Sequence, residues 1–188
     1  MATVRGERRR AALVEAAAAI LLAHGLDGVS HRAVAERARV PLGATTYYFA
    51  TLDDLRRAAV DLVVSRDLTR MERATAKVTK RRRSAQATAR VVVDTLMPGS
   101  HPELVAWFER YLGAARQPVL RVGARAINRA AREHAATILN RSGWDAALPA
   151  TVALAVVDGA MLAALVEGAG ATAARHAAQA ALRTVMEP

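Results

Sequence analysis

Residues that start and end helices are crowded into a short stretch near the amino end of this chain, and they restrict its fold more than any other feature. Gly25 follows a helical stretch and suits the left-handed conformation that ends a helix. Ser30 is a good N-cap for the next helix, and Pro41 disfavours helical geometry at the residue before it. Thr51 and Asp54 have the spacing of a capping box. Only two short helices fit between these signals, one on each side of Pro41.

The two short helices are predicted at residues 31–39 and 42–48, between longer helices at residues 7–24 and 52–80. Apolar residues of the first helix recur at three- and four-residue spacing, which defines an inward face. That face is predicted to hold Leu13, Ala16, Ala17, Ile20, Leu21 and His24. Two short helices joined by a tight turn and braced by longer ones form a helix-turn-helix. The second short helix would enter a DNA groove about 12 Å wide, which explains why it is small and polar.

The composition of the chain favours an all-helical fold. Ala and Val supply most of its apolar residues. Ala is the best helix former, and no stretch shows the two-residue alternation of a strand. Further helices are predicted at residues 84–98, 101–115, 119–141, 149–168 and 172–186. We therefore predict an all-α fold of about nine helices, with a three-helix helix-turn-helix domain at the amino end and a helical bundle after it.

The positive charge of the chain is concentrated in its first half. The net charge is +10, and eighteen of the 27 Lys and Arg residues lie in residues 1–90. A basic front half favours a nucleic-acid partner. The densest basic run, KVTKRRR at residues 77–83, is either a nucleic-acid contact or a solvated helix end. We interpret it as a solvated helix end or linker that adds long-range attraction to DNA.

No pattern in the sequence indicates an enzyme. The absence of Cys excludes disulfides and thiolate metal sites and suits a reducing cytosol. The five His residues lack metal-ligand spacing, no Gly-rich phosphate loop follows a strand, and no nucleophile–base pair can be argued. We therefore expect no metal, no cofactor and no catalytic site. Because no apolar stretch follows the charged start, we expect no signal peptide and a cytoplasmic protein.

A set of landmarks in residues 7–61 forms a combined pattern. The first helix ends in HG, GVS precedes the second, AVAERARV lies within it, and G..TYYF is followed by a helix with an acidic start. This pattern resembles the DNA-binding domain of the tetracycline-repressor-like (TetR) transcriptional regulators. The resemblance implies an all-helical homodimer whose first domain, residues 1–55 and extending to about 61, binds a palindromic operator. A second domain, residues 56–188, would bind a small-molecule effector, dimerise, and release the DNA when the effector binds.

Two positions depart from the family pattern. The family often has Ser or Thr where this chain has Pro41, so the reading helix lacks that cap. The family also often has a Lys early in the fourth helix, where this chain has TLDD. We expect Thr51 or a backbone N–H to make the phosphate contact instead.

The DNA-contacting residues are expected in the two short helices. The candidates are Ser30, His31, Arg32, Leu42, Gly43, Thr45, Thr46, Tyr47 and Tyr48. In helix-turn-helix docking, the second helix reads bases from its amino-terminal part. Gly43 would let the backbone approach DNA closely, and the two Thr residues offer hydroxyls to base edges and methyls to thymine. Helix amino termini favour phosphate, which brings in the residues from Ser30 to Arg32.

Several of these candidates have a second interpretation. Val40, Phe49 and one tyrosine of the pair are expected to anchor the reading helix, which leaves the other tyrosine free to face outward. The resemblance implies that one tyrosine bonds a phosphate, and the alternative is that both lie in the core. The alternative for Arg32 is a solvated surface charge. The alternative for His31 is that it makes no contact with DNA. The arginines in residues 5–10 have three possible interpretations. They lie along the DNA backbone, they enter the minor groove, or they form a solvated face without DNA contact.

The last two helices, at residues 149–168 and 172–186, are predicted to form a dimer interface. The first of them is apolar nearly all round and approaches the length of a membrane span, but Asp158 lies at its centre. Its small residues let two helices approach closely. We therefore predict an isologous four-helix interface across a two-fold axis, with no membrane insertion.

Large side chains in an otherwise Ala-rich region mark candidates for effector binding. These are Met97, Trp107, Phe108, Tyr111, Trp144 and Met161. Ordinary core packing is the alternative for each of them.

The sequence thus predicts a dimeric, ligand-responsive transcriptional regulator, most simply a repressor. The alternative hypotheses are a basic protein that coats nucleic acid without specificity and, less well supported, a membrane-associated helical protein.

Overall fold

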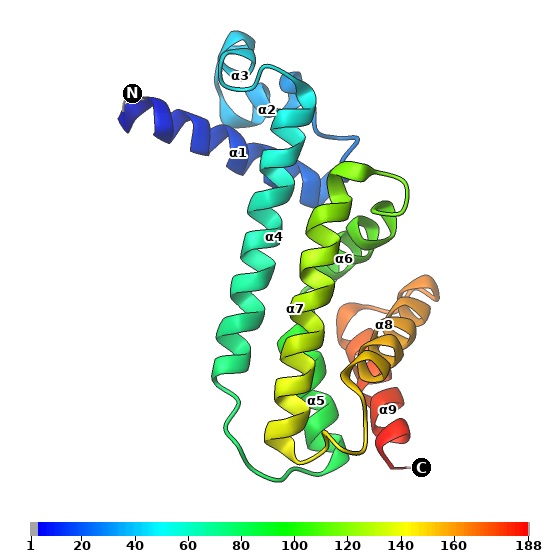
Figure 1. Cartoon of the computed structure of the whole chain (residues 1–188). Coiled ribbons are helices and arrows are strands. Elements are labelled where there is room, and N and C mark those ends of the chain that lie inside the picture. Colours follow the sequence, from blue (N-terminus) through cyan, green and yellow to red (C-terminus); the bar gives the residue numbers. More distant parts are fainter. Residues whose placement is uncertain (1–3, 188) are drawn as a thin grey trace. The chain divides into compact units, whose positions relative to one another are not determined.

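The structure of the chain is a computed structural model that describes residues 4–187, and this range is helical with short connections (Figure 1). Its nine helices confirm the all-α prediction for the described residues. They are α1 (Val4–His24), α2 (His31–Ala38), α3 (Leu42–Tyr48), α4 (Leu52–Ala76), α5 (Ala85–Leu96), α6 (His101–Gly113), α7 (Pro118–Ser142), α8 (Ala150–Val166) and α9 (Ala171–Met186). None of the helices within residues 4–187 combines the length with the apolar character that a membrane span requires.

These helices belong to two compact units, which we describe separately. Unit 1 takes the chain up to Arg66 together with Glu109–Arg125, and unit 2 takes Asp67–Phe108 together with the chain from Ala126 onward. Helices α4, α6 and α7 therefore contribute to both units. The resemblance implies a single domain boundary near residues 55–61, whereas each of these units is built from two separate stretches of the chain. We keep the boundary near residues 55–61 as a proposal.

Local signals set the helix ends in unit 1. Gly25 ends α1 with φ +67°, and the Ser30 hydroxyl caps α2 by accepting the Ala33 N–H at 3.2 Å. Arg39 ends α2 in the left-handed conformation with φ 55°. At the start of α4 one bond of the predicted capping box forms, because the Asp54 N–H donates to the Thr51 hydroxyl oxygen at 3.1 Å. The Asp54 carboxylate accepts the Thr51 hydroxyl at 2.7 Å.

The core of unit 1 is built mainly from α1, α2 and the first half of α4. Its most buried large side chains include Leu13, Leu21, Val29, Val34, Phe49 and Leu55. Five of the six residues predicted for the inward face of α1 are buried, but His24 is exposed in the last turn. Helices α4 and α7 approach closely in this unit, since a Cβ at Gly123 would lie 2.6 Å from Val64 Cγ2.

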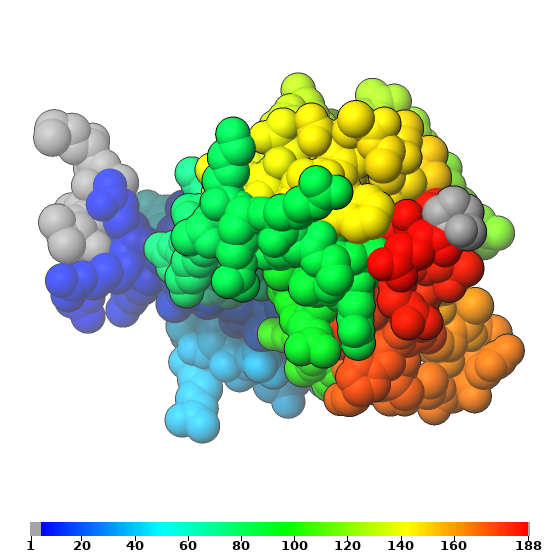
Figure 2. Space-filling model, turned by 90° about the horizontal axis from the view of Figure 1, so that it is seen from below, coloured from blue at the N-terminus to red at the C-terminus, as the bar shows by residue number. Residues whose placement is uncertain are grey.

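Unit 2 packs α9 against both α5 and α8 through small and medium side chains. The connection from residue 77 to residue 84 is not a continuation of α4, which ends at Ala76. The N–H groups of Arg81 and Arg83 donate to the carbonyls of Arg141 and Ser142 at 2.8 and 3.2 Å. This holds the basic run against the end of α7, on the face that Figure 2 shows.

Candidate nucleic-acid interface

Helix α3 presents four of the predicted contact residues on one exposed face. Tyr47 is 82% exposed and Leu42 is 54% exposed, and Gly43 and Thr46 are also exposed. Their spacing places them within one side of a seven-residue helix. The Thr46 hydroxyl donates to the Gly43 carbonyl at 3.2 Å, which leaves its oxygen able to accept a further hydrogen bond.

Thr45 lies on the opposite side of α3 and is fully buried. Its hydroxyl donates to the Leu42 carbonyl at 2.8 Å, and its oxygen lies 3.2 Å from His31 Nδ1. The two side chains therefore join α3 to the start of α2. This corrects the expectation for Thr45, which has a structural position and leaves the set of candidate base contacts.

The aromatic residues at the end of α3 divide as expected into anchors and an outward-facing residue. Phe49 is buried and Tyr48 is half-buried, whereas Tyr47 faces outward. The two tyrosine rings meet edge to face, with their centroids 5.0 Å apart. The Arg10 guanidinium of α1 lies 5.0 Å from the centroid of the Phe49 ring, a cation–π contact that braces the end of α3.

The start of α2, which packs against α3, carries one exposed cation. Arg32 is exposed, whereas Ser30 and His31 are half-buried. The Ser30 oxygen already accepts a backbone N–H, but its hydroxyl hydrogen remains available to a phosphate. The arginines at positions 5, 8, 9 and 10 are exposed along α1.

Arg56 makes a contact between elements that the sequence did not reveal. Its Nε donates to the Val29 carbonyl at 3.3 Å, which joins α4 to the connection before α2. The partners are 27 residues apart, so no local pattern could have identified them.

The candidate effector residues are placed mainly by packing. Met97, Trp107, Phe108 and Met161 are buried, and the Trp144 indole N–H donates to the Arg83 carbonyl at 2.9 Å. Tyr111 belongs to unit 1, whereas the other candidates belong to unit 2. The structure therefore does not gather all six within one unit. In residues 4–187 we find no group of three or more His, Asp or Glu side chains placed to hold a metal ion.

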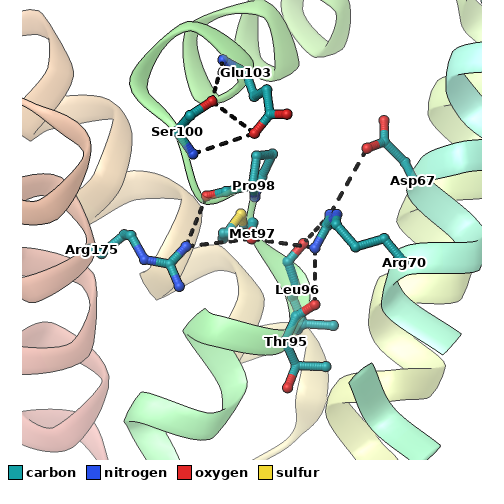
Figure 3. Close-up of polar contacts among 9 residues, drawn as sticks. All are labelled: Asp67, Arg70, Thr95, Leu96, Met97, Pro98, Ser100, Glu103 and Arg175. Carbon is teal, nitrogen blue, oxygen red and sulfur yellow. Dashed lines mark hydrogen bonds and ion pairs between the residues drawn. The ribbon is translucent and has the colours of Figure 1, made fainter. Parts of the chain in front are cut away.

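Two arginines bind the carboxyl end of α5 around one of these candidates, Met97 (Figure 3). Arg70 donates to the carbonyls of Thr95, Leu96 and Met97 at 3.1, 2.9 and 3.3 Å. Arg175 donates to the Pro98 carbonyl at 2.8 Å. Burial lowers the pKa of Arg70, partly offset by the nearby carboxylates.

The Arg70 guanidinium also lies 5.9 Å from the centroid of the Trp107 ring. The Met97 backbone carbonyl and the Trp107 ring therefore both contact Arg70.

Comparisons with known proteins give a consistent result. Residues 79–188 match the family model described as "Tetracyclin repressor-like, C-terminal domain". The transcriptional regulator PksA of Bacillus subtilis (strain 168) is 40% identical over 57 residues, a match that covers 30% of this chain and only 28% of PksA.

Solved structures match over nearly the whole chain. The multidrug binding protein EbrR in complex with proflavin is 30% identical, with 94% of this chain and 99% of that chain covered and a TM-score of 0.66. Its complex with ethidium gives a TM-score of 0.67 at the same identity, with 94% and 98% covered. A TetR-family member from Streptomyces coelicolor A3 is also 30% identical, with 94% and 97% covered and a TM-score of 0.65.

Proposed function

Because this chain belongs to the tetracycline-repressor-like family of transcriptional regulators, we propose that it is a repressor that binds a palindromic operator as a homodimer and is released by a small-molecule effector. The exposed face of α3, formed by Leu42, Gly43, Thr46 and Tyr47, is the observation that carries this proposal. A regulator that reads DNA needs such a face on its second short helix. Membership of a family of regulators also agrees with the expectation that the chain is not an enzyme.

The proposed DNA contacts follow from the exposed groups. A Cβ added to Gly43 would meet no atom within 4 Å, so packing within the chain gives no reason for a glycine there. Close approach of the backbone to DNA would give one. Thr46 would contact a base edge, Tyr47 and Arg32 would contact phosphates, and Tyr48 would contribute its hydroxyl from a half-buried ring.

The proposed homodimer uses α8 and α9. Small and apolar side chains form an exposed strip along these two helices, which we call the α8–α9 strip. It comprises Val152, Ala155, Gly159, Ala163 and Val166 on α8, and Ala173, Ala180 and Thr184 on α9. Packing the strip against its copy across a two-fold axis would bury it. The two α3 helices would then have to lie about 34–36 Å apart to enter successive major grooves.

An effector would act by favouring a different spacing of the two reading helices. The effector can lower operator affinity only to the extent that it binds the conformation with the different spacing more tightly than the conformation that fits the operator. EbrR has been solved with proflavin and with ethidium, so these two compounds are suitable first probes for this chain.

Selection of duplexes from a random pool by the purified protein tests the operator proposal. We expect a two-fold symmetric consensus that the protein binds at least about 1,000-fold more tightly than random DNA. Thr46→Ala and Tyr47→Ala should reduce this preference sharply. Thr137→Ala is the matched control, because its hydroxyl makes the same kind of bond to its own helix, to the Glu133 carbonyl at 2.9 Å. Equal affinity for specific and random duplexes would instead support non-specific coating of nucleic acid.

The effector proposal has its own test. Proflavin or ethidium added to the protein–operator complex should lower operator affinity by about 5- to 150-fold, the usual range of allosteric coupling. Because both compounds bind DNA themselves, competition is measured with and without protein. Binding to the protein without any change in operator affinity would contradict release by these compounds.

A further inference from the structure

Helices α5 and α9 border an open groove on unit 2, and the polar and charged residues that line it have no role in the proposed function. The groove has a volume of about 360 Å³, within the range of small-ligand sites. It is lined by Gln86 and Arg90 from α5 and by His176, Gln179, Ala180 and Arg183 from α9. These two helices border each other on the face that Figure 2 shows.

The lining of the groove carries two guanidinium groups and no carboxylate. The nearby acid on α5, Asp94, is already occupied: its Oδ1 lies 2.6 Å from Arg175 Nη2 and accepts the Gln179 amide at 3.3 Å. Glu187 follows Arg183 by one helical turn but makes no ion pair with it. Among the described residues, the side chains of Arg90 and Arg183 make no hydrogen bond and no ion pair.

Two cations that line one groove without a counter-charge repel each other, and an anion between them removes that repulsion. Guanidinium groups bind carboxylate and phosphate oxygens through paired N–H donors. The imidazole of His176 and the amides of Gln86 and Gln179 supply further donors around the same space. From this convergence of donors we propose that the α5–α9 groove binds a small oxyanion with at least two charged oxygens, of the polycarboxylate or phosphate class.

Such a ligand would connect α5 with α9 through Arg90 and Arg183. It would therefore stabilise the folded chain in proportion to its occupancy. The groove also shares Ala180 with the α8–α9 strip, so the bound anion would lie at the edge of the proposed dimer interface. The site itself depends only on the geometry of one protomer, so it does not depend on the operator or on the effector.

Calorimetric titration of the full chain at low ionic strength tests this proposal, with pyrophosphate and citrate as probes. We expect at least one of them to bind with one anion per chain. Arg90→Gln and Arg183→Gln should each weaken binding by about 10-fold or more, because each removes charge-assisted hydrogen bonds. Arg129→Gln, which removes an exposed arginine from α7 of the same unit, is the matched control and should leave affinity within about twofold. Preference for pyrophosphate or for citrate distinguishes a phosphate ligand from a carboxylate ligand.

A second measurement locates the anion. The side-chain amide signals of Gln86 and Gln179 should shift in nuclear magnetic resonance spectra of the wild type on addition of the anion, and the same shifts should require about 10-fold more anion in Arg90→Gln. The three substituted residues are exposed, so the melting temperatures without anion should match the wild type. Failure of both anions to bind, equal weakening by Arg129→Gln, or shifts confined to other residues would each overturn the proposal.

Discussion

Asp158 is a half-buried carboxylate in the middle of α8, the most apolar helix of the chain. Burial raises its pKa from 3.8 to about 6, because the charged form is poorly solvated there. Among the described residues, its side chain makes no ion pair or hydrogen bond that would offset this cost. The folded chain therefore binds the proton more tightly than the unfolded chain does.

This difference predicts how the free energy of unfolding depends on pH. Below pH 3.8 the Asp158 carboxyl is protonated in both the folded and the unfolded chain, so its burial costs no stability. As pH rises through about 6 the carboxyl becomes charged in the folded chain as well, and the free energy of unfolding is then about 2–3 kcal/mol lower. Asp158→Asn should therefore match the wild type near pH 3.5 and exceed it by about this amount near pH 7.5. Urea unfolding of both proteins at the two pH values measures the effect. A difference between the two proteins that is the same at both pH values would contradict it.

The neighbours Thr45 and Thr46 show where sequence reasoning about single residues ends. Both were candidates for base contacts, yet one is fully buried and the other is exposed. A seven-residue helix is too short for its apolar spacing to define an inner face, since it holds about two turns. The contact of Thr45 with His31, fourteen residues earlier, decides which face is inside. The exposure of Tyr47 was predictable in part, because one tyrosine had to anchor the helix.

At the scale of helices, the ends that depend on local chemistry were predictable and those that depend on distant partners were not. Gly25, Ser30 and Thr51 all act where their residue types predict. The end of α4 differs, because a helix was predicted to continue to residue 80 and the chain leaves it at Ala76. The reason is the backbone bonding of Arg81 and Arg83 to the end of α7, some 60 residues away.

The two left-handed helix ends give a paired prediction. A Cβ at Gly25 would meet no atom within 4 Å, so Gly25→Ala should destabilise the protein by about 1 kcal/mol through backbone conformation alone. Arg39 is exposed and has the same conformation, so Arg39→Gly should stabilise by about 0.5 kcal/mol, after the greater freedom of glycine in the unfolded chain is subtracted. Denaturant unfolding of both variants measures these changes. Effects of the same sign in both variants would contradict this explanation.

The carboxyl end of α5 gives a second prediction at this scale. Arg70→Met would remove hydrogen bonds to three carbonyls and leave them without partners, so it should lower the free energy of unfolding by about 2–3 kcal/mol. Arg66→Met on the same helix is the control. Its ion pair with Glu15 is about half exposed, and such pairs contribute at most about 1 kcal/mol. If both variants lost the same free energy of unfolding, the Arg70 contacts with α5 would contribute no more to stability than the exposed ion pair does.

At the scale of the whole molecule, the order of elements was predictable but their grouping was not. A sequence pattern assigns consecutive residues to one domain, whereas α4, α6 and α7 each contribute to both units. The resemblance also covered only the first third of the chain. Beyond it, bulky residues such as Trp107 and Trp144 could be recognised but not assigned, because their partners, the Arg70 guanidinium and the Arg83 carbonyl, lie far from them in the sequence.

The proposed dimer gives the last prediction, because Gly159 separates effects within one chain from effects between chains. A Cβ at Gly159 would meet no atom within 4 Å, and replacing a glycine inside a helix favours the helix by about 0.8–1.0 kcal/mol. Gly159→Leu should therefore not destabilise the isolated chain. In a dimer that buries the α8–α9 strip, the added side chain would be overpacked at a cost of about 2 kcal/mol or more. The dissociation constant of the dimer should then rise by at least about 30-fold.

Sedimentation equilibrium of the wild type and of Gly159→Leu measures this constant. Ala87→Leu, which places the same leucine side chain on the exposed face of α5, is the control. Operator affinity should fall together with dimerisation, since the two reading helices must be held at a fixed separation. A Gly159→Leu protein that dimerises as tightly as the wild type would place the interface elsewhere. Weakened dimerisation with unchanged operator affinity would instead mean that one reading head is sufficient for binding.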